Sequence, residues 1–154
     1  MATVYSVQKT KWSQNNPTER VNTNEQAGRI RIAYALYEAS SLSADDVIEM
    51  FNLPNGARVL EGTLTHDALG SSSTLSVGHA AYANADGTAV ALDADEFFAA
   101  AASTSITTVA VAATSALGRN TVIDADGDGY PVTVTLAGAA GTGTIELQMY
   151  YVVD

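Results

Sequence analysis

The sequence predicts an all-β protein: an antiparallel β-sandwich, jelly-roll-like, with an extended N-terminal arm and one short helix. Short runs with apolar and polar residues in alternation recur at intervals of about 10–15 residues. Gly, Asn and Asp separate these runs and mark turns between strands. Strands do not alternate with helices along the chain, which argues against a doubly wound nucleotide-binding fold.

The first 27 residues are predicted to form an arm, and residues 28–154 the sandwich domain. Residues 4–9 alternate weakly and predict an edge strand. The following polar stretch to Asn24 predicts an extended loop, with a turn at Asn15–Pro17. The first clear strand spans Gly28–Tyr37 and ends before the serines at 40–43. Its alternation puts Ile30, Ile32, Tyr34 and Leu36 on one face, and Arg29, Arg31, Ala33 and Tyr37 on the other.

The next segment, Asp45–Phe51, fits either a strand or a helix capped at Ser43. The β-branched pair Val47–Ile48 and the early stop at Pro54 favour the strand. Asp93–Ala102 predicts the helix, because Asp93 can cap it, Glu96 completes a capping box and alanine favours helices. Further strands are predicted over residues 57–66, 74–78, 106–113, 121–124, 131–136 and 144–153.

Composition limits the chemistry of this 154-residue, 15.9 kDa chain. It has no cysteine, which excludes disulfides, thiolate nucleophiles and Cys-based metal sites. Hydrophobic residues make up 47% of the chain and charged residues only 16%, so we expect a homo-oligomer. The first six residues do not resemble a signal peptide, and no apolar run is long enough to span a membrane. We therefore expect a soluble protein made in the cytoplasm.

Charge is divided unevenly between the arm and the body. Residues 1–31 carry a net charge of +3 and the remainder −13. Either the basic residues are the solvated charges of an ordinary first strand, or the arm docks on an acidic partner such as another subunit. Nucleic acid is not an expected partner, since the body would be repelled by phosphate. The candidate partner-binding residues are Lys9, Lys11, Trp12 and Arg20, where Trp12 either folds back onto the body or anchors the arm in a partner.

Asp124–Gly129 is the strongest local motif. It matches the first six positions of a calcium-binding loop, but the twelfth position holds Thr135 in place of the bidentate glutamate. A tight Asp/Gly hairpin turn explains the same residues, so we expect no metal and no cofactor. A weak calcium site formed by Asp124, Asp126 and Asp128 is the alternative.

Enzymatic chemistry finds little support in the sequence. His66 and His79 are the only histidines, and we expect them at the surface or in turns. Two of the three acids Asp93, Asp95 and Glu96 could serve as the carboxylate pair of a glycosidase. The N-terminus of the predicted helix, however, explains acidic residues at these positions. No nucleophile–base pair and no phosphate-binding loop can be assembled, so we expect a protein that is not an enzyme.

Three segments together resemble small structural proteins of tailed bacteriophages. They are Asp46–Glu49 followed by Leu53–Leu60, then Asp67–Gly78, then Gly141–Leu147 with the closing Tyr150–Val153. Several proteins of this kind resemble head decoration, or cement, proteins, which are often trimeric β-sandwiches on the capsid exterior. The resemblance covers residues 28–154 and includes neither the basic arm nor the Asp/Gly turn.

The resemblance implies a non-enzymatic virion structural protein. Its most specific form is a decoration protein made in the host cytoplasm, which binds the major capsid protein on the capsid exterior and stabilises contacts between capsid subunits. The resemblance also implies self-association as a trimer. From charge and hydropathy, neither nucleic acid nor membrane is expected as a partner. The alternatives are a head–tail or tail component, the base of a head fibre, and a carbohydrate- or calcium-binding β-sandwich module.

Overall fold

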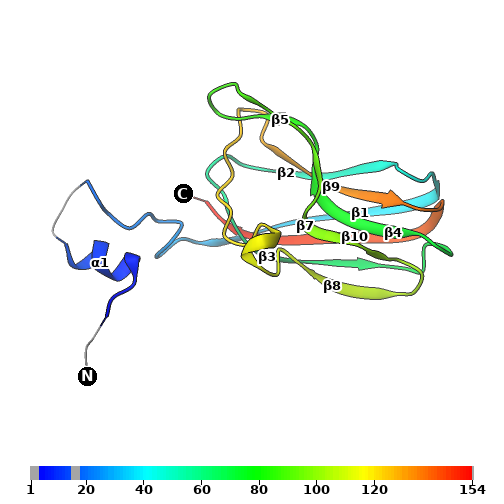
Figure 1. Ribbon diagram of the computed structural model, residues 1–154, viewed down its shortest axis with the longest axis horizontal. Helices are drawn as coiled ribbons and strands as arrows, with labels where there is room; N and C mark the ends of the chain where they lie inside the picture. Colours follow the sequence, from blue (N-terminus) through cyan, green and yellow to red (C-terminus); the bar gives the residue numbers. More distant parts are fainter. Residues whose placement is uncertain (1–3, 15–17, 154) are drawn as a thin grey trace.

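The chain folds into a two-layer β-sandwich, seen in a computed structural model that describes residues 4–14 and 18–153. Within these residues, two four-stranded antiparallel sheets have the strand orders β1-β10-β3-β8 and β2-β9-β4-β7 (Figure 1). The first and last long strands are therefore neighbours in one sheet, and successive strands of the sandwich cross between the layers, except that β4 and β7 pair within one sheet. This is the strand arrangement of a jelly roll, so the predicted all-β sandwich is confirmed.

The elements have the following bounds. They are α1 Val7–Ser13, β1 Ile30–Leu42, β2 Val47–Leu53, β3 Arg58–His66, β4 Thr74–His79, β5 Tyr82–Ala83, β6 Ala89–Val90, β7 Asp93–Ala102, β8 Thr107–Val111, a 3₁₀ turn at Ser115–Leu117, β9 Tyr130–Ala137 and β10 Gly141–Val152. β5 and β6 form a small hairpin of their own.

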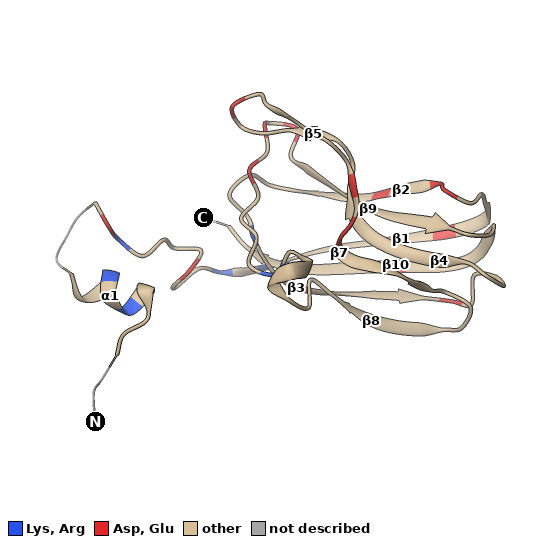
Figure 2. Cartoon of the chain, viewed as in Figure 1, with Lys and Arg blue, Asp and Glu red and all other residues tan. Residues whose placement is uncertain are grey.

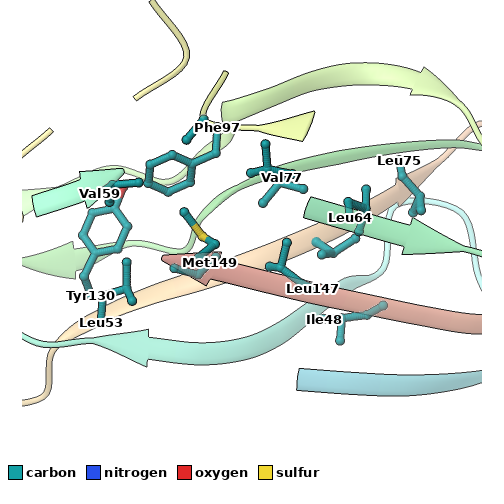
Figure 3. Packing of buried hydrophobic residues seen from close by; sticks show 14 of the residues in the cluster. Ile48, Leu53, Val59, Leu64, Leu75, Val77, Phe97, Tyr130, Leu147 and Met149 are labelled. Carbon is teal, nitrogen blue, oxygen red and sulfur yellow. The ribbon is translucent and has the colours of Figure 1, made fainter. Parts of the chain in front are cut away.

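The core lies between the two sheets (Figure 3). Leu64 of β3 and Leu147 of β10 pack from one layer, and Val77 of β4 and Phe97 of β7 from the other, all fully buried. In β10, every second side chain from Ile145 to Met149 is buried, as expected for strands with one face in a core. One continuous core of aliphatic side chains thus holds the sandwich together.

The helix predicted over Asp93–Ala102 is wrong, because this segment is strand β7. It pairs with β4, with Val77 opposite Phe98 and Leu75 opposite Ala101. Phe97 points into the core and is fully buried. An isolated ten-residue helix would gain little stability in water, whereas strand pairing and burial of Phe97 stabilise the extended form. Tertiary contacts therefore override the helix propensity of the alanines.

The edge strand predicted over residues 4–9 is also wrong. Residues 4–6 lie outside any element and Val7–Ser13 forms α1, the short helix of the described chain. Ser6 caps this helix, and its side-chain oxygen accepts a hydrogen bond from the Lys9 N–H at 3.2 Å. No strand lies beside this segment in the described chain to pair with it, so local capping decides its structure. The turn predicted at Asn15–Pro17 lies outside the described residues.

Two smaller predictions need correction. The strand expected over residues 121–124 reduces to a single bridge between Val122 and Arg58. The break expected at residues 40–43 does not end β1, which continues to Leu42 through a register shift. Ser41 lies within this register shift and has a positive φ of 61°. The strand interpretation of Asp45–Phe51 is confirmed by β2.

Candidate functional site: an outward apolar strand and a basic arm

The described residues of the arm project beyond the end of the sandwich, and the start of the stretch predicted as an extended loop is instead helical, because α1 covers Val7–Ser13. α1 is tied to the segment that leads into β1, where the Gln8 side-chain N–H donates to Glu25 at 3.1 Å. This hydrogen bond lowers the pKa of Glu25 below its ordinary value. The helix itself buries no residue. In Figure 1, α1 lies beyond the end of the sandwich, near the start of β1.

The predicted partner-binding residues are exposed on this arm. Trp12 is 66% exposed, so it does not pack on the sandwich. Lys9 and Arg20 are exposed and Lys11 is half-buried, and within the described residues none of the three forms an ion pair. Figure 2 shows basic residues on α1 and at the start of β1, while acidic residues are spread over the sandwich. The described part of the arm therefore exposes the apolar Trp12 and the basic Lys9 and Arg20.

An ordinary edge strand turns its large apolar side chains toward the core, whereas strand β1 turns four of them toward solvent. The positions of β1 that are turned toward the core include the half-buried Ala33 and Ala35 and the fully buried Ala39, whereas Arg31 and Tyr37, at the same alternate positions, remain exposed. Its outward positions hold the large apolar residues Ile30, Ile32, Tyr34 and Leu36, which are 67%, 53%, 55% and 53% exposed. We call these four residues the β1 stripe. A one-residue shift in register would bury them, so the observed register keeps them outside.

The rest of the same sheet face carries mainly polar or small side chains, apart from Tyr150 of β10 opposite Ile32. Across the sheet, Tyr34 is followed by Gln148 on β10, Thr63 on β3 and Ala110 on β8. In the next row Leu36 is followed by Glu146. The aliphatic groups of the rows of Ile32, Tyr34 and Leu36 thus lie along the β1 edge, with Tyr150 of β10 beside Ile32. An exposed apolar row bordered by polar groups is typical of a protein–protein interface.

Both histidines are buried, which contradicts the expectation that they lie at the surface or in turns. His66 is 4% exposed and His79 is 5% exposed. His66 Nδ1 lies 2.8 Å from the Asp67 carbonyl, and His79 Nδ1 lies 2.8 Å from the Ala80 carbonyl. These backbone oxygens can only accept, so each Nδ1 carries a proton. The sequence could not indicate this burial, because the histidines' neighbours come from other strands.

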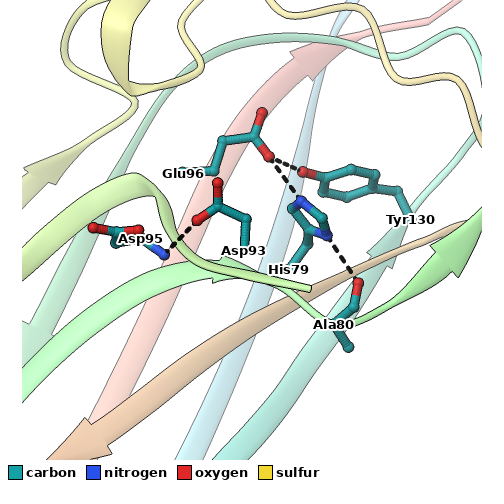
Figure 4. A network of polar contacts seen from close by, with 6 residues as sticks. All are labelled: His79, Ala80, Asp93, Asp95, Glu96 and Tyr130. Carbon is teal, nitrogen blue, oxygen red and sulfur yellow. Dashed lines mark hydrogen bonds and ion pairs between the residues drawn. The ribbon is translucent and has the colours of Figure 1, made fainter. Parts of the chain in front are cut away.

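His79 belongs to a network that joins three strands (Figure 4). Its Nε2 lies 3.3 Å from Glu96 on β7, and Tyr130 on β9 donates to the same carboxylate. The ring of Tyr130 also packs at 4.9 Å from His79 and 6.0 Å from Phe97, measured between centroids. Burial, followed by the hydrogen bond to Glu96, raises the pKa of Tyr130 well above its ordinary value. These contacts link β4, β7 and β9 within the β2-β9-β4-β7 sheet.

The geometry of this network favours a structural role. Among the described residues, no serine or threonine hydroxyl is hydrogen-bonded to either histidine. Asp93 and Asp95 lie on the same strand as Glu96, where the Asp95 N–H donates to Asp93 at 3.1 Å. That neighbouring carboxylate raises the pKa of Asp95. The three acids mark an irregular stretch of β7 rather than the helix N-terminus that was expected.

The Asp124–Gly129 segment forms a turn just before β9, but not a hairpin, because no strand precedes it. The Asp124 carboxylate accepts from the Ala85 N–H at 3.2 Å, and Asp126 accepts from the Asp128 N–H at 3.0 Å. In the described chain, no three His, Asp or Glu residues are grouped so that they could hold a metal ion. The carboxylates of Asp124 and Asp126 are engaged by backbone groups, and the calcium alternative stays a prediction.

The described part of the chain contains no helix that is long and apolar enough to cross a membrane. Comparison with models of protein families finds no match, and the curated proteins give none either.

The fold is similar to that of chains in two phage capsids. A chain in the capsid asymmetric unit of cyanophage Pam1 has a TM-score of 0.60 and 21% identity, covering 92% of this chain and 99% of that one. A chain in the capsid of Ralstonia phage GP4 has a TM-score of 0.61 and 26% identity, covering 82% and 86%. The first likeness concerns the fold alone. Together they support the predicted resemblance to tailed-phage virion structural proteins.

Proposed function

We propose that this chain is a non-enzymatic virion structural protein that decorates the outside of a phage capsid. In this role it binds the major capsid protein, associates with itself as a trimer and stabilises contacts between capsid subunits. The single observation that carries the proposal is the likeness to chains of phage capsids. In the Pam1 case the likeness covers 99% of the matched chain, so that chain consists of this domain and little else.

The surface of the molecule supports an assembly role. The β1 stripe leaves four large apolar side chains in water, and the arm leaves Trp12 and two lysines available. A partner that covers these groups removes apolar area from water, which favours the bound state. Because the decoration protein would bind the assembled shell and not its separate subunits, its binding free energy would stabilise the closed shell.

The test is occupancy on purified particles that lack this protein. Wild type is compared with a chain lacking residues 2–20 and with Trp12→Ala, each at low and at high salt. The deletion stops at residue 20 because the Thr23 carbonyl lies against Gly28 at the base of β1. Ile106→Ala is the matched control, since Ile106 is 76% exposed but lies between β7 and β8, far from the arm in sequence.

We expect wild type and the control to saturate particles, and the deletion to bind weakly. Trp12→Ala should cause a large part of that loss, about 30-fold in affinity, as for a central aromatic at an interface. If the arm acts through charge alone, salt should weaken binding and Trp12→Ala should not. Failure of wild type to bind capsids, or its location in the tail in a density map of the virion, would contradict the decoration role.

A further inference from the structure

We infer that the β1 stripe is the docking site for the arm of a second copy of this chain. The arm segment concerned is residues 4–14, with α1 at its centre. This inference deepens the proposed function, on which it rests, by naming the surface through which copies associate. Four observations support it. Both surfaces are apolar, their charges are complementary, their lengths agree, and the arm points away from its own sheet.

The arm and the stripe are both apolar surfaces without a partner. Residues 4–14 expose Val4, Tyr5, Val7 and Trp12, each more than 60% in water. α1 buries none of its residues against the rest of the chain. A short helix without tertiary packing is only marginally stable in water, so α1 needs a surface to lie on. The β1 stripe is an apolar surface of the same molecule that remains uncovered.

The charges of the two surfaces are complementary. Residues 4–14 contain Lys9 and Lys11 and no acidic residue. On the receiving face, Glu38 follows Leu36 at the next outward position of β1, and Glu146 lies opposite Leu36 on β10. From Ile32 to Glu38, the outward positions of β1 and the facing positions of β10 include no lysine or arginine. Apolar contact along the stripe would therefore place the lysines within reach of two carboxylates.

The lengths of the two surfaces also agree. The stripe from Ile30 to Leu36 covers six residue steps of a strand, about 20 Å. The seven residues of α1 rise about 10 Å, and the extended residues 4–6 add about 10 Å more. One arm can therefore cover one stripe from end to end.

The position of the arm points to a neighbour's stripe rather than its own. The hydrogen bond between Gln8 and Glu25 holds α1 close to the segment before β1. Figure 1 shows α1 beyond the end of the sandwich, while β1 runs from that end toward the opposite one. An arm held in this position projects away from its own sheet face and toward the space a neighbouring copy would occupy.

The first experiment measures self-association by light scattering across a concentration series. Trp12→Ala in the arm and Tyr34→Ala in the stripe should each raise the dissociation constant by at least about 10-fold. The double variant should be little worse than either single variant, because both remove the same contact. Ile106→Ala is again the control and should match wild type. All three side chains are exposed, so melting temperatures measured at low concentration should be unchanged.

The second experiment identifies which copy supplies the arm. Since the chain has no cysteine, any disulfide that forms must join two introduced cysteines. Copies with Gln14→Cys, an exposed arm position that leaves the Gln8–Glu25 hydrogen bond intact, are mixed under mild oxidation with copies of different length that carry Gln148→Cys, next to Tyr34. The matched control is Ala110→Cys, which lies in the same row of the sheet but two strands further from β1. We expect mixed disulfides to form at least 10-fold faster with Gln148→Cys than with Ala110→Cys.

Three outcomes would overturn the inference. The first is disulfide formation only within one chain when both cysteines are in the same copy, which would place the arm on its own stripe. The second is unchanged association after loss of residues 2–20, which would leave stripe-to-stripe packing. The third is a monomer at every concentration. Occupancy on particles is measured separately, so a monomer that still binds capsids would refute this inference and the trimer, and leave the capsid-binding part of the proposed function standing.

Discussion

Gly78→Ala should destabilise the sandwich strongly, because the backbone of β7 lies so close to this glycine of β4 that no side chain fits between the two strands. A Cβ at Gly78 would lie 2.0 Å from the Asp93 carbonyl oxygen and 2.5 Å from the carbonyl carbon of Ala94. The pairing is irregular here, since Val77 faces Phe98 and the next paired position, His79, faces Asp93. The extra residues of β7 bulge over the backbone of Gly78.

The size of the effect follows from these distances. Ordinary van der Waals contact begins near 3.4 Å, so the backbone of β7 would have to move by about 1.4 Å. Neither backbone can yield without loss of ladder hydrogen bonds on both sides of the bulge. Overpacking of this kind costs about 1–3 kcal/mol and each lost hydrogen bond about 1 kcal/mol, which gives about 3–4 kcal/mol in total. For a domain of this size the melting temperature should fall by roughly 10 °C.

Thermal unfolding followed by circular dichroism measures this loss. All samples are compared at one protein concentration, because self-association shifts the melting temperature. Gly127→Ala is the matched control, since a Cβ at Gly127 would meet no atom within 4 Å. We expect the control to stay within about 0.5 kcal/mol of wild type. A Gly78→Ala protein that also melts within about 2 °C of wild type would refute the close approach of β7 to β4.

Two further predictions concern titration and metal. Because burial raises the pKa of Tyr130, the folded protein keeps this phenol neutral while the unfolded chain ionises it above about pH 10. Stability should therefore be full below pH 10 and fall above it, by up to about 1.4 kcal/mol per pH unit, and Tyr130→Phe should reduce this slope in urea titrations. An unchanged slope would contradict the burial of the phenol. Chelator should leave the melting temperature unchanged, because backbone N–H groups engage Asp124 and Asp126; a fall of more than about 5 °C would instead favour the calcium alternative.

The sequence was sufficient to predict most strands and the jelly-roll class. Alternation and turn residues located β2, β3, β4, β8, β9 and β10 to within a few residues. Prediction failed where local and tertiary preferences conflict. In Asp93–Ala102 the local signals for a helix are strong, and the signals for a strand lie in β4, far away in the chain. Reasoning from one segment at a time cannot weigh such a contact.

The candidate interface was only half predictable. Alternation correctly grouped Ile30, Ile32, Tyr34 and Leu36 on one face of a strand, but it does not say which face points inward. The usual rule puts the larger apolar set inside. Here the alanines Ala33 and Ala35 are turned toward the core and the larger residues toward water. The paired register of β1 with β10 was needed to reveal this inversion.

If the arm of each copy lies on the stripe of the next, the contact is heterologous, because the two copies contribute different surfaces. Such contacts form a closed ring only when the rotation between copies divides a full turn. A rotation of one third of a turn gives the proposed trimer, with every arm and every stripe occupied. Two copies that exchange arms would form a dimer with the same property, and a rotation that does not close would give open chains with one free stripe at an end. An arm–stripe contact that closes into a ring therefore predicts that association stops at one discrete mass, whereas open chains would give a range of masses. A single light-scattering species that is three times the 15.9 kDa chain would identify the three-fold ring among these arrangements.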